Sequence, residues 1–218
     1  MRRRAFLAGV ALWAPVAAAA QAQTAAPAAP KPYQVEGFRS AKFGMTEAEV
    51  RRAIQLDFNV RESAITRETN PTELTTVLII SAQDVLPEVG KVRIAYTLGY
   101  QSRKLMQVVL AWGAGVSDTA PGTTSVLAGA KLLQTYFLAQ PFLTEGRVVN
   151  SQMADGSSLL FQGLDEKGRL VQLVYGQIPW PPPKKPEEKP PPRVPFARVV
   201  YSEDPTNPDI FRIKKGQF

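Results

Sequence analysis

The reactive side chains in this sequence are carboxylates, lysines, tyrosines and serines, because the 218 residues include no histidine and no cysteine. Without imidazole, the chain lacks the commonest general base and the commonest zinc or haem ligand. Without thiolates as well, the usual zinc sites, iron-sulfur clusters, blue-copper sites and imidazole-based triads are excluded. The sequence therefore predicts no cofactor and no metal site.

Carboxylate pairs are the main chemistry that remains. Glycosidase-type hydrolysis needs two carboxylates on either side of a cleft. The candidates, which fall in predicted turns or solvent-facing positions, are Glu62, Glu68, Asp84, Asp155 and Asp165. Turns are where Asp and Glu ordinarily cap backbone groups, and the sequence has no phosphate-binding glycine loop or Gly-x-Ser-x-Gly elbow. We therefore predict no catalytic residue and no enzyme activity, with a histidine-independent carboxylate hydrolase as an alternative.

Three further features of the sequence are candidate sites. The segment 202–209, SEDPTNPD, has oxygen-bearing residues near calcium-like spacing, but it lacks the glycine and final glutamate of an EF-hand loop. Its two prolines favour a self-capped turn. Trp112 ends an alternating strand, which favours a place in the core. Trp180 lies among prolines, where it would either anchor a partner or pack on its neighbours. None of these patterns assigns a binding residue.

The N-terminus has the layout of an export signal. Three arginines follow Met1, an apolar run extends from residue 5 to 16, and small residues surround Ala22. We expect a signal peptide at 1–22, cleaved after Ala22, and a periplasmic protein. The stretch RRAFL also fits the twin-arginine pattern, so the general secretory and twin-arginine routes both remain open.

The chain after cleavage begins with a segment low in apolar bulk and broken by prolines, which predicts a flexible spacer at 23–36. Loss of the three leader arginines lowers the formal charge from +7 to +4. The remaining basic residues are dispersed among acids, which is typical of a solvated surface and not of a nucleic-acid partner. We also expect no membrane span after cleavage.

Residues 37–116 predict a first α+β unit. Thr46-Glu47-Ala48-Glu49 is a capping box, and apolar residues at helical spacing follow it, which indicates a helix from about Thr46 to Leu56. After the helix, the apolar residues recur at every second position. Strands are expected at 74–81, 91–100 and 103–112, and their short links favour an antiparallel meander.

Residues 117–218 repeat this order as a second α+β unit. A helix is expected from about Thr123 to Ala139, followed by strands at 147–153, 158–163, 169–177 and 196–202, with turns at Asp155-Gly156 and 165–168. Between the last two strands, the segment 179–195 is rich in proline and charge, which predicts a polyproline loop. The fold class is thus α+β, with two helix-plus-antiparallel-meander units, and whether they share one sheet stays open.

The stretch FRSAKFGMTEAEVRRAI, residues 38–54, resembles the opening of the export-pathway domains typified by the BamE (SmpA/OmlA) family. In that pattern a glycine precedes a threonine cap, an acidic turn and a short helix that leads into an antiparallel sheet. The β-lactamase inhibitor protein, similar in fold, has two such units in tandem. This chain lacks the lipidated cysteine of BamE and the disulfides of the inhibitor. The resemblance implies a fold and a tendency toward protein binding, without a transferable partner.

Together these patterns predict a non-enzymatic protein-binding or scaffolding module of the cell envelope, with an envelope protein of unknown identity as its partner. The alternative is a carrier of a small ligand, held between the sheet and the helices. A large apolar pocket at that interface would favour the carrier, and a filled interface would count against it. The oligomeric state is left open.

Overall fold

The computed structural model describes residues 31–83, 85–116, 123–180, 191–213 and 216, which belong to the compact unit Lys31–Phe218. The predicted signal peptide at 1–22, most of the spacer and the interior of the proline-rich loop lie outside these residues. Within the described residues, no helix combines the length and the apolar character that crossing a bilayer requires.

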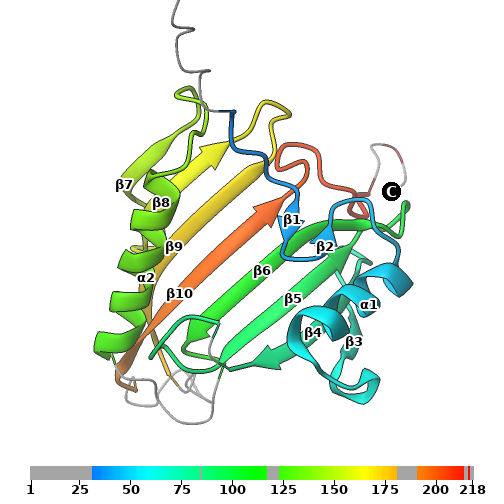
Figure 1. The fold of residues 1–218 in the computed structure, drawn as a ribbon, viewed down its shortest axis with the longest axis horizontal. Helices are drawn as coiled ribbons and strands as arrows, with labels where there is room; N and C mark the ends of the chain where they lie inside the picture. Colours follow the sequence, from blue (N-terminus) through cyan, green and yellow to red (C-terminus); the bar gives the residue numbers. More distant parts are fainter. Residues whose placement is uncertain (1–30, 84, 117–122, 181–190, 214–215, 217–218) are drawn as a thin grey trace, which may run out of the picture. The chain divides into compact units, whose positions relative to one another are not determined.

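One eight-stranded antiparallel sheet dominates the fold (Figure 1). Its strands follow the order β3-β4-β5-β6-β10-β9-β8-β7. Their bounds are β3 Thr66–Thr69, β4 Thr76–Ala82, β5 Val92–Leu98, β6 Leu105–Gly113, β7 Val148–Gln152, β8 Ser158–Leu164, β9 Leu170–Pro179 and β10 Arg193–Ser202. The α+β class and the antiparallel sheet predicted from the sequence are confirmed.

The strand order is symmetric about the pair β6 and β10. Helix α1 (Glu47–Phe58) precedes the meander β3 to β6, and helix α2 (Thr123–Leu138) precedes the meander β7 to β10. The final strand of each meander pairs with the other, from Phe196 opposite Gly113 to Ser202 opposite Gln107. Both helix-plus-meander segments therefore share one continuous sheet, which the sequence did not decide.

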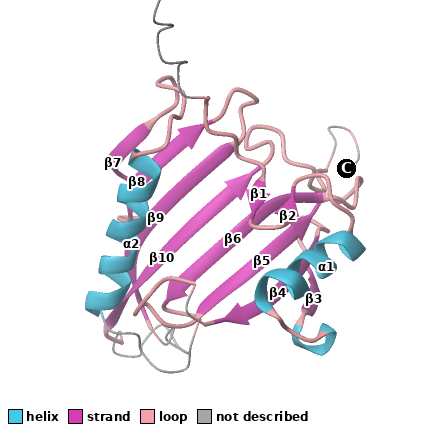
Figure 2. Ribbon diagram, viewed as in Figure 1, coloured by secondary structure: helices cyan, strands magenta, loops and turns pink. Residues whose placement is uncertain are grey.

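Both helices lie on the same face of the sheet, and a small hairpin of β1 (Gly37–Phe38) and β2 (Ala41–Lys42) lies between them (Figure 2). Helix α1 begins as predicted, because the Glu49 carboxylate accepts hydrogen bonds from both the backbone N–H and the hydroxyl of Thr46, each at 2.8 Å. The helix buries the side chains predicted for its inner face, Val50, Ala53 and Ile54.

The core fills the space between this face and the helices. Alternate strand residues point into it, so that Val199 of β10 lies between Leu110 of β6 and Leu173 of β9, and all three are buried. The largest fully buried side chains include Trp112 and Tyr96. On the opposite face the intervening residues are half-buried or exposed across much of the sheet's centre.

Two predictions require correction. The spacer does not reach residue 36, because Val35 is buried and its N–H donates to the Asp165 carboxylate at 3.0 Å. The proline-rich loop 179–195 is shorter than predicted, because β9 ends at Pro179 and β10 begins at Arg193. Pro195 is tolerated inside β10 because β6 ends opposite Phe196, and the Pro195 carbonyl accepts from the Ala114 N–H.

Three short elements were not predicted at all. They are the hairpin β1–β2, a 3-10 turn (Glu62–Ala64) and the edge strand β3. Strand β3, with the sequence TRET, is exposed at all four positions. It therefore has no apolar alternation for a sequence pattern to detect.

Candidate functional site

A pocket of about 580 Å³ lies between α2 and the sheet, on the side that faces the hairpin β1–β2. Strands β6 and β10 form its floor, α2 forms one wall, and the hairpin forms the opposite rim. The loop between β4 and β5 contributes Val85 and Leu86. The pocket therefore lies along the seam where the two halves of the sheet meet.

The register of β6 and β10 gives the pocket a direction. Moving along the floor, the paired residues are Tyr201 with Val108, Val199 with Leu110, and Ala197 with Trp112. At about 3.3 Å per strand residue, the step from Tyr201 to Ala197 covers roughly 13 Å. Tyr201 marks the end beneath the hairpin, since its ring lies 5.9 Å from the Phe38 ring, and Trp112 marks the other end.

The Trp112 end is apolar. Leu86, Trp112 and Leu132 line it. The β4–β5 loop packs directly on α2 there, because a Cβ at Gly129 would lie 2.5 Å from a Val89 methyl. Glycine at this helix position thus permits the close approach that shapes the apolar end.

Tyrosine hydroxyls gather at the other end. Tyr33, Tyr136 and Tyr201 all line the pocket, and Tyr136 is close enough to Tyr33 to affect its ionisation. Burial, together with the neighbouring Tyr136, raises the pKa of Tyr33, and burial raises the pKa of Tyr201. These hydroxyls therefore keep their protons at neutral pH and can donate hydrogen bonds.

The hairpin β1–β2 brings two cations to the rim, Arg39 and Lys42. It is tied to α1, because the Asp57 carboxylate accepts from the N–H and the hydroxyl of Ser40 at 2.9 and 2.6 Å. Arg39 adopts a positive φ of 51° at the hairpin tip, a conformation that costs energy for a residue with a side chain. The Asp57 anchor and the tight turn hold it there.

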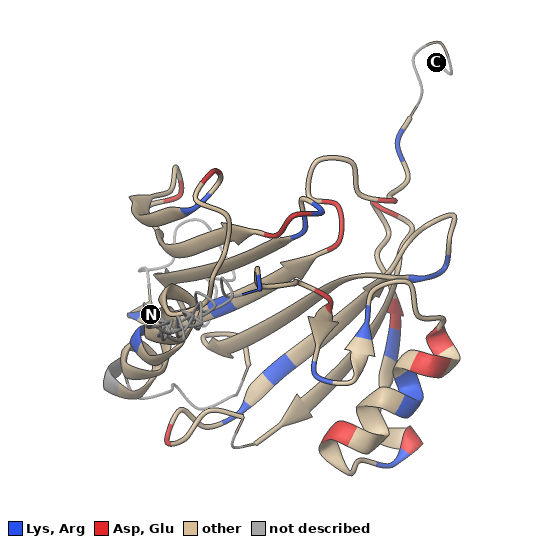
Figure 3. Cartoon of the chain, turned by 45° about the horizontal axis from the view of Figure 1, so that its top comes forward, with Lys and Arg blue, Asp and Glu red and all other residues tan. Residues whose placement is uncertain are grey.

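The two cations have different partners. The Lys42 ammonium pairs with the Glu36 carboxylate at 3.3 Å. Among the described residues, the Arg39 guanidinium donates one hydrogen bond, to the Asp57 carbonyl at 3.1 Å, and its Cζ lies 4.7 Å from the centre of the Phe58 ring. Most of its N–H groups thus remain available to a ligand. Figure 3 shows that charged residues are frequent on α1 and sparse on α2.

Two buried donors near this region have no hydrogen-bond partner among the described residues, the Trp112 indole N–H and the Tyr96 hydroxyl. A buried polar group without a partner costs about 1–3 kcal/mol. Trp112 lines the pocket, as part of the core that the alternating pattern predicts. Trp180 is half-buried, and its ring carbons lie 3.7 Å from where a Cβ on Gly115 would stand.

The carboxylates considered for catalysis have structural partners or lie apart from the pocket. Asp165 is buried, and it accepts from the Lys167 and Arg169 N–H groups at 2.8 and 2.9 Å. Asp155 accepts from the Ser157 N–H and hydroxyl. Glu62 pairs with Arg51, and Glu68 is exposed in β3, while Asp84 lies outside the described residues.

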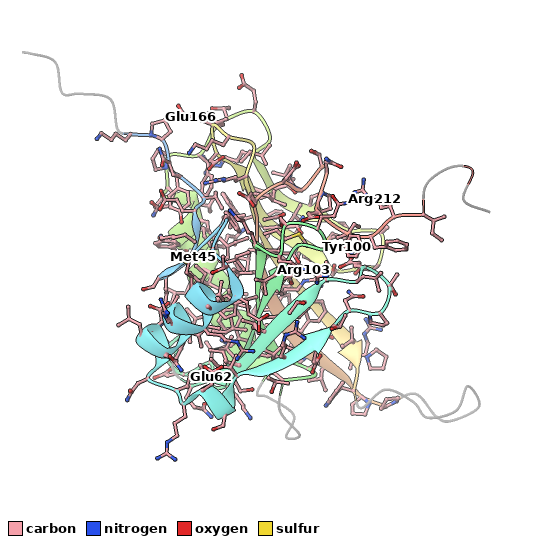
Figure 4. All side chains as sticks on the ribbon, turned by 90° about the vertical axis from the view of Figure 1, so that its right-hand side faces the viewer. Met45, Glu62, Tyr100, Arg103, Glu166 and Arg212 are labelled. Carbon is pink, nitrogen blue, oxygen red and sulfur yellow. The ribbon has the colours of Figure 1, made fainter. Side chains whose placement is uncertain are left out.

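Two of these acidic positions also lie far apart. Figure 4 places Glu62 and Glu166, the neighbour of Asp165, at opposite ends of the sheet. Carboxylates so separated cannot flank one scissile bond. Among the described residues, no group of three or more acidic side chains could hold a metal ion.

The segment 202–209 forms the predicted turn. The Asp204 carboxylate accepts from the N–H groups of Thr206 and Asn207 at 3.1 and 2.9 Å. Asp209 accepts from the Gln101 and Ser102 N–H groups, so it closes the β5–β6 loop. Figure 4 shows Tyr100, Arg103 and Arg212 together at this end. Backbone capping thus accounts for the oxygen-bearing residues of the segment.

Searches against protein-family models, curated proteins and solved structures find no significant match to this chain. The likeness to the BamE family therefore remains a prediction from residues 38–54. The candidate site rests on its geometry alone.

The residues at the polar end of the pocket were missed by sequence reasoning. Tyr33, Tyr136 and Tyr201 are far apart in the chain, and their proximity depends on the docking of α2 and of the N-terminal segment on the sheet. One signal was present in the sequence. Helix α2 has Leu132 and Tyr136 beyond its buried stripe, and both side chains are at least half exposed. An amphipathic helix that needs only one apolar face does not explain them.

Proposed function

We propose that this chain is a non-enzymatic binding protein that holds a small ligand with a substantial apolar part in the pocket between α2 and the sheet. The single observation that carries the proposal is the pocket itself, about 580 Å³ with an apolar end and a polar end. Ligand sites of drug-sized molecules occupy about 300–1,000 Å³ and are mostly apolar with a few polar groups. With the export signal expected at 1–22, the proposed setting is the periplasm.

A binding role is favoured over an enzymatic one by the composition of the pocket. Glu36 is the one carboxylate among its described lining residues, and it is paired with Lys42. Tyrosines with a raised pKa stay protonated at neutral pH, so they do not act as general bases there. The lining thus offers hydrogen-bond donors and apolar surface, which suit binding and release.

The test is a titration of the full chain with N-phenyl-1-naphthylamine, an uncharged apolar fluorophore. We expect saturable binding, one site per chain, with Kd on the order of micromolar. Leu133→Trp should weaken this binding by about tenfold or more, since Leu133 is half-buried in the pocket wall and the larger ring fills the space.

Leu138→Trp is the matched control. Leu138 is on the same helix, 38% exposed, and is not among the lining residues. It should leave binding unchanged, and circular dichroism should show that both variants are folded. If the unaltered chain shows no saturable binding, or if both variants bind equally well, the proposal is wrong.

Protein binding is a second candidate, favoured by the open face of the sheet. Among the described residues, both helices lie on the other face (Figure 1). Half-buried Ala95, Val109 and Val200 are neighbours across the centre of the open face, next to the exposed Arg93 and Arg198. Such a mixture of apolar and arginine surface is compatible with a protein partner. This candidate agrees with the envelope scaffold implied by the BamE-like residues 38–54.

A photo-crosslinking amino acid at position 198 tests this second candidate. A defined envelope protein should be captured there, and the capture should be lost on competition with unlabelled chain. The same group at Arg52, exposed on α1, is the control position. Equal capture at both positions, or none at 198, would remove the open face as a docking surface.

A further inference from the structure

We infer that the ligand of this pocket is an anionic amphiphile, with its negative head at the tyrosine and arginine end and its apolar tail toward Trp112. This inference rests on the proposed function and adds the chemical class and the orientation of the ligand. It is carried by the uneven distribution of donors, charges and apolar side chains along the pocket.

Hydrogen-bond donors dominate the head end. The hydroxyls of Tyr33, Tyr136 and Tyr201 are close enough to influence one another's ionisation, and burial keeps those of Tyr33 and Tyr201 protonated. The Tyr201 hydroxyl makes no hydrogen bond to another described residue. A hydroxyl in this position can donate to a ligand oxygen without losing an existing bond. Donors without matching acceptors favour a ligand head that accepts.

The net charge of the head end is positive. Arg39 and Lys42 contribute two cations, and Glu36 contributes the one carboxylate found among the described lining residues. Glu36 already pairs with Lys42, so a cationic head would meet Arg39 without a free counter-charge. An anionic head would instead gain charge-assisted hydrogen bonds from the guanidinium. Charge therefore distinguishes the anionic head from cationic and neutral ones.

Arg39 lies at the same level of the sheet as the tyrosines. The charge of Arg39 affects the ionisation of Tyr96. Tyr96 of β5 pairs with Val108 of β6, and Val108 pairs with Tyr201 of β10. The ring neighbour of Arg39, Phe38, contacts Tyr201. The hairpin thus places Arg39 on the rim of the same pocket that the tyrosines line.

The tail end offers no comparable group. Beyond Val199, the lining consists of Leu86, Trp112, Leu132 and neighbouring apolar side chains. The indole N–H of Trp112 is covered by protein atoms, with less than 1 Å² of its surface accessible, so it offers no donor to a ligand. About 13 Å of floor separates the levels of Tyr201 and Ala197, which suits an extended hydrocarbon chain.

The test compares three ligands with the same twelve-carbon chain and different heads: dodecanoate, dodecanol and dodecylammonium. Each is titrated calorimetrically into the full chain below its micelle concentration. We expect dodecanoate to bind about tenfold more tightly than dodecanol, with dodecylammonium the weakest. Dodecyl phosphate is a fourth ligand, which separates a preference for carboxylate from one for phosphate, and tighter binding than dodecanol by either anion supports the inference.

Two variants locate the head. Arg39→Gln should reduce dodecanoate affinity about tenfold and leave dodecanol within about twofold, because the guanidinium contributes to the charged head alone. Arg52→Gln, on the exposed side of α1, is the control and should change neither. Tyr201→Phe should weaken dodecanoate binding by a few-fold with an unchanged unfolding temperature at neutral pH, because the lost hydroxyl has no partner among the described residues.

The outcomes separate the inference from the proposed function. If dodecanol or dodecylammonium binds as tightly as both dodecanoate and dodecyl phosphate, or if Arg39→Gln lowers all affinities equally, the inference is overturned while the pocket keeps its function. If none of these ligands and no uncharged fluorophore binds, both are overturned. A tightening of dodecanoate relative to dodecanol in Arg39→Gln would also contradict the inference.

Discussion

The two helices of this protein occupy equivalent places in the chain, each before a four-stranded meander, yet they differ in their number of charged residues. Helix α1 has five charged residues in its 12 positions, and it forms ion pairs with Glu62 and Arg67 outside itself. Helix α2 has Lys131 as the one charged residue in its 16 positions. It leaves Leu132 and Tyr136 at least half exposed beside the pocket.

Under the proposed function, this difference gives the α1 half a supporting role and the α2 half the ligand site. Helix α1 is fixed by its capping box, by its ion pairs and by the Asp57 carboxylate that anchors the hairpin. Helix α2 is positioned so that one side of it packs on β8 to β10 and its other side faces the seam. We interpret the α1 half as the support that positions Arg39, and the α2 half as the wall that admits a ligand.

The largest expected effect on stability comes from the α1 half. Ile54→Ala should destabilise the protein by about 2–5 kcal/mol, because this fully buried side chain would leave a cavity between α1 and the sheet. Chemical denaturation of the variant and the unaltered chain measures this loss. A destabilisation below about 1 kcal/mol would show that α1 is not firmly packed.

A second effect is the loss of stability at high pH that the buried tyrosines cause. Burial raises the pKa of Tyr96 and Tyr201 above the ordinary value. Stability from a raised pKa is complete below the unfolded value of about 10 and is lost as pH rises through the folded value. Thermal unfolding between pH 9 and 11 should therefore show a falling midpoint, and the fall should be shallower in Tyr201→Phe. An identical slope in both proteins would contradict the burial of this hydroxyl.

A smaller effect concerns the start of α1. Hydrogen bonds from the Thr46 backbone N–H and hydroxyl lower the pKa of Glu49. A lowered pKa contributes stability above the unfolded value of about 4.3, and this stability is lost as pH falls through the folded value. Glu49→Gln should thus lower the unfolding temperature at pH 7 and converge with the unaltered chain near pH 3. A constant difference at both pH values would contradict this account.

The smallest effect on stability is expected in the α2 half. Leu132→Ala should change the free energy of unfolding by no more than about 0.5 kcal/mol, because the side chain is 53% exposed. The same variant should weaken binding of the apolar fluorophore, since Leu132 lines the apolar end. A large loss of stability with unchanged binding would reverse the roles assigned to the two halves.

The regular elements could be predicted from the sequence because each has a strong local pattern. The capping box at Thr46 places the start of α1, and the alternation in 91–100 and 103–112 identifies β5 and β6. Strand β3 could not be found this way, since its exposure leaves no alternation. The central position of β10 could not be predicted either, because its pairing with β6 joins strands that are distant in the sequence.

The pocket could not be predicted for a related reason. Its head end joins residues 33, 39, 136 and 201, and no spacing rule connects them. The missing histidines and cysteines restrict the chemistry from the start, but they say nothing about where a cavity forms. The sequence did provide the alternative function, a carrier that holds a small ligand between the sheet and the helices. A pocket at that interface is the feature that favours this alternative.

The most direct test of the central claim is a methyl NMR titration of the isotope-labelled full chain with dodecanoate. We predict that the shifted methyl signals belong to Leu110, Leu133 and Val199, which line the pocket, while Val109 and Val200 on the opposite face stay unchanged. Shifts at Val109 and Val200 with none at Val199 would place the binding surface on the open face and contradict the account.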